Sequence, residues 1–401
     1  MGESVWVLGA SMTKVGRYPD KDVVDLAAEA TFNALDDAGV SIFDIQVLAA
    51  GSMFNMGGIG QAVAKQVGQT GIPIYNVVNA CATGATAVRT ALLEIQAGNA
   101  DFGLAIGAEQ MGKMGLLAGN AARGGGGEKK WEPEGRYGSV MPVDGWLGSG
   151  TMPAVFGQAG MEYAYKNDGV GFEQFAKVAQ KNHEHSSLNP LAQYNKVFTL
   201  EEIMDARVIS YPNTLPMCCP TGDGAAAIVL VSESKLKTLS LEQQKRAVKV
   251  SASVLTSDPW SEGGESQPDV NTLTRNAADK AYELAGVGPE DLDLVELHDC
   301  FATAELIHYD NLRLCEPGGA GEFIDKRAPW RDGSMPVNVS GGLLSKGHPI
   351  GMTGAAGVFE ITTQLRGEAG DRQIEGAKVG MAHVIGLGSS CGIHILEKAA
   401  V

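Results

Sequence analysis

Residues 23–48, VVDLAAEATFNALDDAGVSIFDIQVL, have the pattern of a helix followed by a strand, and the pattern returns at residues 273–295 as LTRNAADKAYELAGVGPEDLDLV. In each copy, small and apolar side chains recur at helical spacing, Ala-Gly-Val follows, and an apolar run begins after an aspartate. Ala38 and Ala285 are 247 residues apart, and the two aspartates have the same offset. The repetition predicts a chain built from two duplicated halves.

The segments that follow each copy also correspond. A short strand ends at Val-Asn, at residues 78–79 and again at 337–338, and a Gly-rich turn and an Ala/Gly-rich helix come next. Gly-containing apolar strands are expected at 102–107 and 377–386, and another strand at 225–231 completes the sheet of the first half. Strands that alternate with helices need crossover connections, which predicts an α/β fold with a parallel or mixed sheet covered by helices on both faces.

The pattern breaks in the middle of the chain, where four consecutive glycines, several prolines and tryptophans occur. We expect an N-terminal half at 1–115 plus 211–240, an inserted loop domain at 116–210 and a C-terminal half at 241–401. Within the loop domain, apolar residues at helical spacing from Phe172 to His183 predict at least one packed helix.

Composition limits the class of protein. The chain has 401 residues, of which 44% are hydrophobic and 19% charged, so it can bury a large core. Its net charge of −16 argues against a nucleic-acid surface. No apolar run is long enough to span a membrane, and the N-terminus does not resemble a signal peptide, so we expect a cytoplasmic protein. Its six cysteines include no Cys-x-x-Cys pair and are expected to be free thiols.

The first candidate for chemistry is Cys81, in a run where a strand turns through small residues into a helix. A cysteine at a helix N-terminus meets unpaired N–H groups that favour the nucleophilic thiolate. The alternative is that Cys81 is a small buried hydrophobe, as most free cysteines are.

The second candidate is His348, which lies in a Gly-rich turn at the equivalent helix entry of the second half. A histidine there can take the proton of a thiol and so activate it. A histidine satisfied by the backbone of the turn is the competing interpretation.

The third candidate is His298-Asp299-Cys300-Phe301, which follows the second copy's strand. Residues two apart on an extended segment share a face, so His298 and Cys300 could point into one pocket. Zinc binding is a weak alternative, because no second cluster has ligand spacing; we expect no metal.

Together these motifs resemble the thiolase superfamily, and specifically the sterol-carrier-protein-x (SCP-2) thiolases. Those enzymes carry His-Asp-Cys-Phe, as residues 298–301 do here, where ordinary thiolases carry Asn-Glu-Ala-Phe. The likeness extends to Cys-Cys-Pro-Thr-Gly-Asp-Gly at 218–224 and Gly-Leu-Gly-Ser-Ser at 386–390. It implies a five-layered α-β-α-β-α fold of two sheets and a central helical layer, in a homodimer or a dimer of dimers. A fused sterol-carrier domain is not expected, since the chain stops at Val401.

The resemblance also implies a mechanism. His348 would accept the proton of Cys81, and the thiolate would attack the 3-keto carbon of a 3-oxoacyl-CoA. His298 and His348 would hold the enolate oxygen, and the N–H groups of Cys81 and Gly388 the thioester oxygen. Ordinary thiolases take the final proton from a cysteine that aligns with Gly386, so Cys300 is the candidate acid here. Coenzyme A would be a co-substrate, with no permanently bound cofactor.

The sequence departs from the sterol-carrier-type thiolases at two places, and two alternative functions remain open. His383-Val384 stands where sterol-carrier-type thiolases often have His-Asn, and the turn after Gly388 is unusually polar. The first alternative is a thiolase-like retro-aldol lyase that acts on a steroid or branched 3-hydroxyacyl-CoA with a small partner protein. The second is a non-catalytic scaffold. Because the protein is acidic overall, CoA needs local cations, and the loop-domain candidates are Arg123, Lys129, Lys130 and Arg136.

Overall fold

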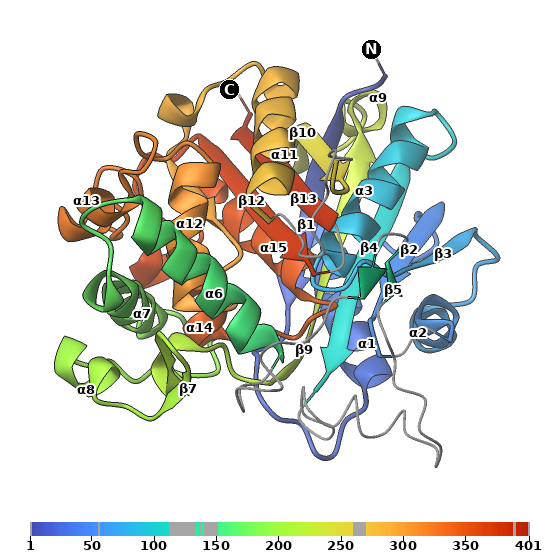
Figure 1. The fold of residues 1–401 in the computed structure, drawn as a ribbon. Helices are drawn as coiled ribbons and strands as arrows, with labels where there is room; N and C mark the ends of the chain where they lie inside the picture. The colour runs from blue at the N-terminus through green and yellow to red at the C-terminus, as the bar shows by residue number, and fades with distance from the viewer. Residues whose placement is uncertain are drawn as a thin grey trace.

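The computed structural model describes residues 2–54, 57–111, 134–135, 138–139, 151–259, 270–387 and 390–399. The first half contributes five strands and three helices (Figure 1). They are β1 (Val5–Met12), α1 (Val23–Ala38), β2 (Val47–Gly51), α2 (Ile59–Val67), β3 (Ile74–Val77), α3 (Thr83–Gln96), β4 (Phe102–Gln110) and β9 (Asp223–Ser232).

The second half follows the same plan, with extra helices. Its elements are β10 (Val248–Thr256), α11 (Val270–Ala285), β11 (Leu294–Glu296), α12 (Ala302–Asn311), α13 (Ala320–Asp325), α14 (Gly342–Lys346), α15 (Thr353–Arg366), β12 (Val379–Gly386) and β13 (Ser390–Lys398). The expected duplication is present. The strands of the first half have the order β3-β2-β4-β9-β1, and the strands β11-β12-β13-β10 of the second half correspond in order to β2-β4-β9-β1. Val337, which pairs in parallel with Val295, takes the place of β3.

The Ala-Gly-Val turns that revealed the duplication end α1 and α11. Gly39 and Gly286 have φ angles of +65° and +72°, a left-handed conformation that glycine adopts without strain. Asp22 begins α1 by accepting hydrogen bonds from the N–H groups of Val24 and Asp25. The sequence pattern therefore marks helix boundaries as well as helices.

Further elements lie between β4 and β9 and between β9 and β10. They are β5 (Glu134–Gly135), β6 (Gly138–Ser139), α6 (Thr151–Lys166), α7 (Phe172–Ser186), α8 (Leu200–Met204), β7 (Val208–Ser210), β8 (Asn213–Thr214), α9 (Glu233–Leu236) and α10 (Leu241–Arg246). The helix expected from Phe172 to His183 is α7. Helices α6 and α7 pack mainly on α12, α13 and α14 of the second half. The limits of an inserted domain at 116 and 210 stay a prediction.

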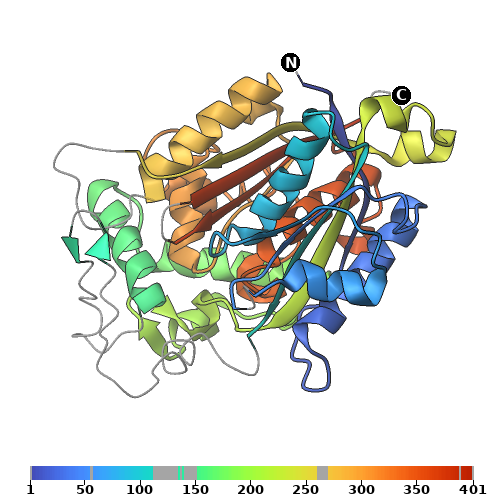
Figure 2. The ribbon, with the colours of Figure 1, turned by 90° about the vertical axis from the view of Figure 1, so that its right-hand side faces the viewer.

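The strands of the two halves are hydrogen-bonded to each other, which differs from the two separate sheets that we expected. In the described residues they form one nine-stranded sheet, because β1 and β10 pair through Val5–Val7 and Val248–Val250. The pairing of β1 with β10 involves only three residues of each strand. The order of the helical and strand layers is as expected. Helices α3 and α15 lie between the two groups of strands, with α1 and α11 on the outer faces (Figure 2).

Glycines bring the two central helices unusually close together at their N-termini. A Cβ atom on Gly354 of α15 would overlap the backbone of Ala85 in α3, and one on Gly84 would lie 2.7 Å from the Ala355 nitrogen. Because neither residue has a side chain, the two backbones can touch. The residues just before α3 and α15 are thereby brought together, and these include Cys81 and His348.

Candidate active site

Cys81 lies on a tight turn between β3 and α3, where we expected it. Ala80 before it has a φ of +48°, which is rare for a residue with a side chain. The Thr83 hydroxyl stabilises this turn, since it donates to the Ala80 carbonyl oxygen at 2.6 Å and accepts from the Asn79 N–H at 2.9 Å. The turn leaves Cys81 partly exposed, directly before Ala82, the N-cap of α3.

His348 contacts Cys81 across the boundary between the halves. Its Nε2 atom is 3.3 Å from the Cys81 sulfur, and its Nδ1 atom is 2.7 Å from the Thr353 hydroxyl. The Thr353 hydroxyl also lies 3.0 Å from the Pro349 carbonyl oxygen, and when it donates there it accepts from Nδ1 of His348. In that arrangement Nδ1 carries the proton, and Nε2 has a free lone pair for the Cys81 thiol. The pairing that we expected is present in the orientation that a general base needs.

Both members of the pair are uncharged at neutral pH. Burial and, to a smaller extent, the nearby Glu109 carboxylate raise the pKa of Cys81 to about 12, although N–H groups of Cys81 and Leu387 oppose this. Burial lowers the pKa of His348 to about 3. The N–H groups at the start of α3 are therefore not sufficient to keep Cys81 as a thiolate in the resting site. Desolvation outweighs the helix, and the proton must move to His348 as the sulfur attacks.

The protonation states predict the pH dependence of the enzyme. His348 is neutral above its low pKa and Cys81 keeps its proton below its high pKa, so kcat/KM should be flat from about pH 5 to pH 9. Steady-state rates with the 3-oxoacyl-CoA substrate that the resemblance implies, and circular dichroism to confirm folding at each pH, would test this. An acid limb near pH 6.5 would show instead that His348 titrates as an ordinary histidine.

His298 completes a compact group with Cys81 and His348. The two histidine rings are perpendicular, with centroids 5.2 Å apart. Donor atoms of the three residues all lie within 4.8 Å of one another. Burial and the neighbouring histidines His348, His383 and His308 hold the pKa of His298 well below its ordinary value, so it is neutral. Such a thiol and imidazole set could also bind a metal, but the absence of a resident metal stays our prediction, because catalysis needs the sulfur free.

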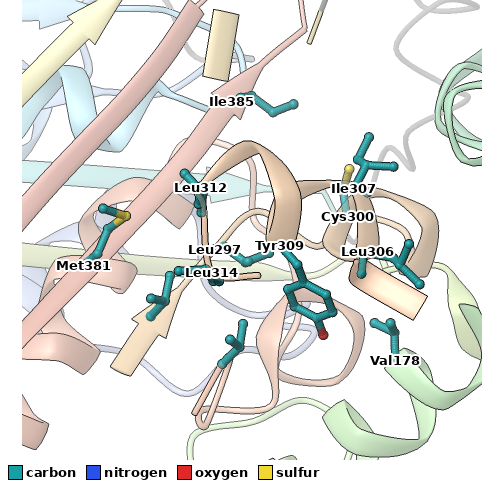
Figure 3. Close-up of a cluster of buried hydrophobic side chains, with 14 of the residues drawn as sticks. Val178, Leu297, Cys300, Leu306, Ile307, Tyr309, Leu312, Leu314, Met381 and Ile385 are labelled. Atoms are coloured by element: carbon teal, nitrogen blue, oxygen red, sulfur yellow. The ribbon is translucent and has the colours of Figure 1, made fainter. Parts of the chain in front are cut away.

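Cys300 lies in a cluster of buried apolar side chains that includes Leu297 and Ile307 (Figure 3). It is only 5% exposed, and it lies outside the group of three. Burial raises the pKa of Cys300 well above its ordinary value, and the Cys219 and Cys81 thiols raise it further. Cys300 therefore holds its proton, as a proton donor must.

Gly386, which the resemblance aligns with the acidic cysteine of ordinary thiolases, has no room for a side chain here. A Cβ atom there would overlap the Asn79 carbonyl oxygen and would lie 3.2 Å from the Ala82 nitrogen. The turn that carries Cys81 occupies the space of any side chain at 386. Cys391 is no substitute, because it is buried in the core on β13.

Sequence reasoning missed three contributors to the site. Thr353 fixes the tautomer of His348, but a threonine in a helix gives no signal of its own. Glu109, at the end of β4, accepts from the Ser52 hydroxyl at 2.8 Å and from the Gly351 N–H at 3.2 Å, and so joins the halves. Cys219 donates its N–H to the Cys300 carbonyl oxygen at 3.0 Å; the Cys-Cys pair in the sequence was its only hint.

Some predicted site residues lie outside the described residues. They are Gly388, Arg123, Lys129, Lys130 and Arg136. Their roles stay predictions.

The fold and the site together define a thiolase. Residues 5–210 match the thiolase N-terminal domain family, and residues 262–398 match the family described as thiolase C-terminal domain-like. The chain belongs to the thiolase family, and the expected superfamily, α/β fold and acyltransferase class are confirmed.

Individual proteins resemble the chain over nearly its whole length. The chain is 40% identical over 393 residues to sterol carrier protein 2 of Bos taurus, covering 96% of this chain and 70% of that protein. It is 34% identical over 405 residues to the acetyl-CoA acetyltransferase of Methanothermobacter thermautotrophicus, covering 98% of this chain and 99% of that protein. The Ltp2-ChsH2(DUF35) aldolase has the same fold, with a TM-score of 0.81 at 21% identity, covering 100% of this chain and 99% of that one.

In the part of the chain that the structure describes, no helix has the length and apolar character to cross a membrane.

Proposed function

We propose that this chain is a thiolase that cleaves or forms 3-oxoacyl-CoA through an acyl group carried on Cys81. The observation that carries the proposal is the Cys81–His348 contact of 3.3 Å, with Nε2 of His348 free to take the thiol proton. A binding scaffold would not need a neutral base oriented toward a cysteine by a third residue.

In the cleavage direction, the Cys81 sulfur attacks the 3-keto carbon while its proton passes to His348. The bond between C2 and C3 then breaks, and its electron pair remains on C2 as an enolate whose oxygen is held by His298 and His348. Cys300 donates a proton to C2, which releases acetyl-CoA or propionyl-CoA. CoA then attacks the acyl group on Cys81 and leaves as the shortened acyl-CoA. The proton that CoA loses when its sulfur attacks the acyl-enzyme restores Cys300, and Cys81 regains its own proton from His348.

The direct test is the purified protein with a 3-oxoacyl-CoA and CoA. We expect CoA-dependent formation of two acyl-CoA products, and mass spectrometry of the enzyme quenched without CoA should find the acyl group on Cys81. A variant Cys315→Ser, at a half-buried cysteine outside the site, should be acylated as the unmodified protein is.

The same assay distinguishes a thiolase from a retro-aldol lyase and from a non-catalytic scaffold. A retro-aldol lyase would cleave a 3-hydroxyacyl-CoA without CoA, and would leave no acyl group on Cys81. The shared fold of the Ltp2-ChsH2(DUF35) aldolase is the observation that keeps this second function in view. A scaffold would give no turnover with either substrate.

We also propose that the cations of the loop segment bind the phosphates of CoA. Reversing the charge at Lys129 and Lys130 together should raise the KM for CoA about tenfold, with little effect on kcat, because lost phosphate contacts weaken binding equally in the ground and transition states. Lys280→Glu, at an exposed lysine of α11, is the matched control. An unchanged KM in the loop variant would remove this assignment.

A further inference from the structure

Two buried segments carry three of the proposed catalytic side chains, and buried carboxylates connect them. Residues 296–301 hold His298 and Cys300, and residues 338–348 lead through α14 to His348. Asp299 lies between His298 and Cys300, and its side chain is fully buried. A buried aspartate needs hydrogen-bond partners to offset its desolvation, so its contacts indicate what it holds in place.

Asp299 binds the beginning of α14. Its Oδ1 atom accepts from the Leu343 N–H at 2.7 Å, and its Oδ2 atom accepts from the Leu344 N–H at 3.2 Å. Gly342 allows this close approach, since it has a φ of +58° and a Cβ atom there would overlap the Asp299 carboxylate. The segment with His298 and Cys300 is therefore fastened to the helix that precedes His348.

A second attachment comes from α7. The side-chain NH₂ of Asn182 donates to Asp299 Oδ2 at 2.8 Å and to Glu305 Oε2 at 2.6 Å. Lys181 in turn donates to the Asn182 oxygen at 2.7 Å and pairs with Glu305 Oε1 at 2.7 Å. All four side chains are buried. Burial and the neighbouring Glu305 raise the pKa of Asp299 to about 8, and the N–H groups of Leu343 and Leu344 oppose this. Every partner of Asp299 named here is a donor, so the carboxyl oxygens hold the segment from two sides by accepting hydrogen bonds.

Other contacts hold His348 independently of Asp299. Glu296 accepts from the Ser340 N–H at 3.0 Å and from Lys346 Nζ at 3.2 Å, so it secures both ends of the segment before His348. Thr353 orients the His348 ring itself. Glu296 and the Cys219 N–H still hold the two ends of residues 296–300 when the Asp299 carboxylate is lost. The loss would therefore loosen the stretch between them, which carries His298 and Cys300, and would leave the Cys81–His348 pair in place.

We infer that Asp299, supported by Asn182, is a positioning residue that fixes His298 and Cys300 for the carbon–carbon bond step and is dispensable for acyl transfer at Cys81. The inference rests on the proposed function, because it divides that reaction into its two parts. In acyl transfer between CoA molecules, His348 takes the proton of the attacking thiol and returns it to the departing thiol, so Cys300 keeps its proton throughout. Cleavage of the C2–C3 bond also needs the enolate contacts and the proton of Cys300, which CoA then restores.

The test compares two reactions of Asp299→Asn. The first is cleavage of a 3-oxoacyl-CoA by CoA, and the second is exchange of isotopically labelled CoA into an acyl-CoA. The kcat of cleavage should fall about 100-fold, as expected for a displaced catalytic group, while the exchange rate stays within about threefold of the unmodified enzyme. Glu360→Gln is the matched control, because Glu360 is an equally buried carboxylate that pairs with Arg372 away from the site; both its reactions should be unchanged.

The two reactions distinguish failure of this inference from failure of the proposed function. Equal losses of cleavage and exchange in Asp299→Asn, or a loss no larger than in Glu360→Gln, would overturn the inference. Should Asp299→Asn not fold, Asn182→Ala removes the support and keeps the carboxylate; it should lower cleavage about tenfold and spare exchange, and equal effects would again overturn the inference. If the unmodified protein neither cleaves nor exchanges, the proposed function fails instead.

Discussion

Replacing His348 with asparagine should lower the kcat of thiolytic cleavage by about 10⁴-fold. Asparagine can still donate to the Thr353 hydroxyl, so the turn should keep its shape, but it cannot take the Cys81 proton. Burial raises the pKa of Cys81 to about 12, so very little thiolate would exist at neutral pH without the base. The KM for CoA should change little, because the lost proton transfer belongs to the transition state.

Cys81→Ala should abolish the reaction, and adding it to His348→Asn should cost only a few-fold more than either change alone, since nucleophile and base act as one unit. The control is His183→Asn on α7, a buried histidine whose Nε2 lies 3.1 Å from the Pro216 carbonyl oxygen. It should retain full activity. Additive losses in the double variant would contradict the paired mechanism.

The sequence was informative about the fold because the duplication leaves a local signal. The Ala-Gly-Val turns at 38–40 and 285–287 recur since a helix that ends before a strand needs a left-handed residue, and glycine meets that need at low cost. The join between β1 and β10 left no such signal. It depends on how two distant strands approach, and their local sequences carry no record of it.

The same contrast applies to the site. Cys81, His298, Cys300 and His348 lie in short motifs whose spacing is set by the chain itself, and the structure brings three of them within 4.8 Å of one another. Thr353, Glu109 and Asn182 act through contacts between distant segments, so a single sequence holds no pattern for them. The sequence motif also shows only the helix N-terminus that favours a thiolate, and not the burial that raises the pKa of Cys81.

Gly354→Ala is expected to destabilise the protein by about 3 kcal/mol or more, although alanine is the better helix former. The reason is the crossing of α15 with α3, where a Cβ atom at 354 would overlap the backbone of Ala85 and lie 2.7 Å from its Cβ atom. Backbone atoms at the start of a helix cannot turn aside as a flexible side chain can, so the two helices must separate. Thermal unfolding should show a Tm lower by about 5 °C or more.

Gly357→Ala is the matched control, because Gly357 lies in the same helix one turn later and its added Cβ would meet only the Cβ atom of Ala382, at 3.3 Å. It should leave stability within about 1 kcal/mol, since its gain in helix propensity offsets one tight contact. Separation of α3 and α15 would also lengthen the Cys81–His348 distance, as these residues precede the two helices. Gly354→Ala should therefore lose activity even at temperatures where it stays folded, whereas a variant that is merely less stable would keep its full kcat there.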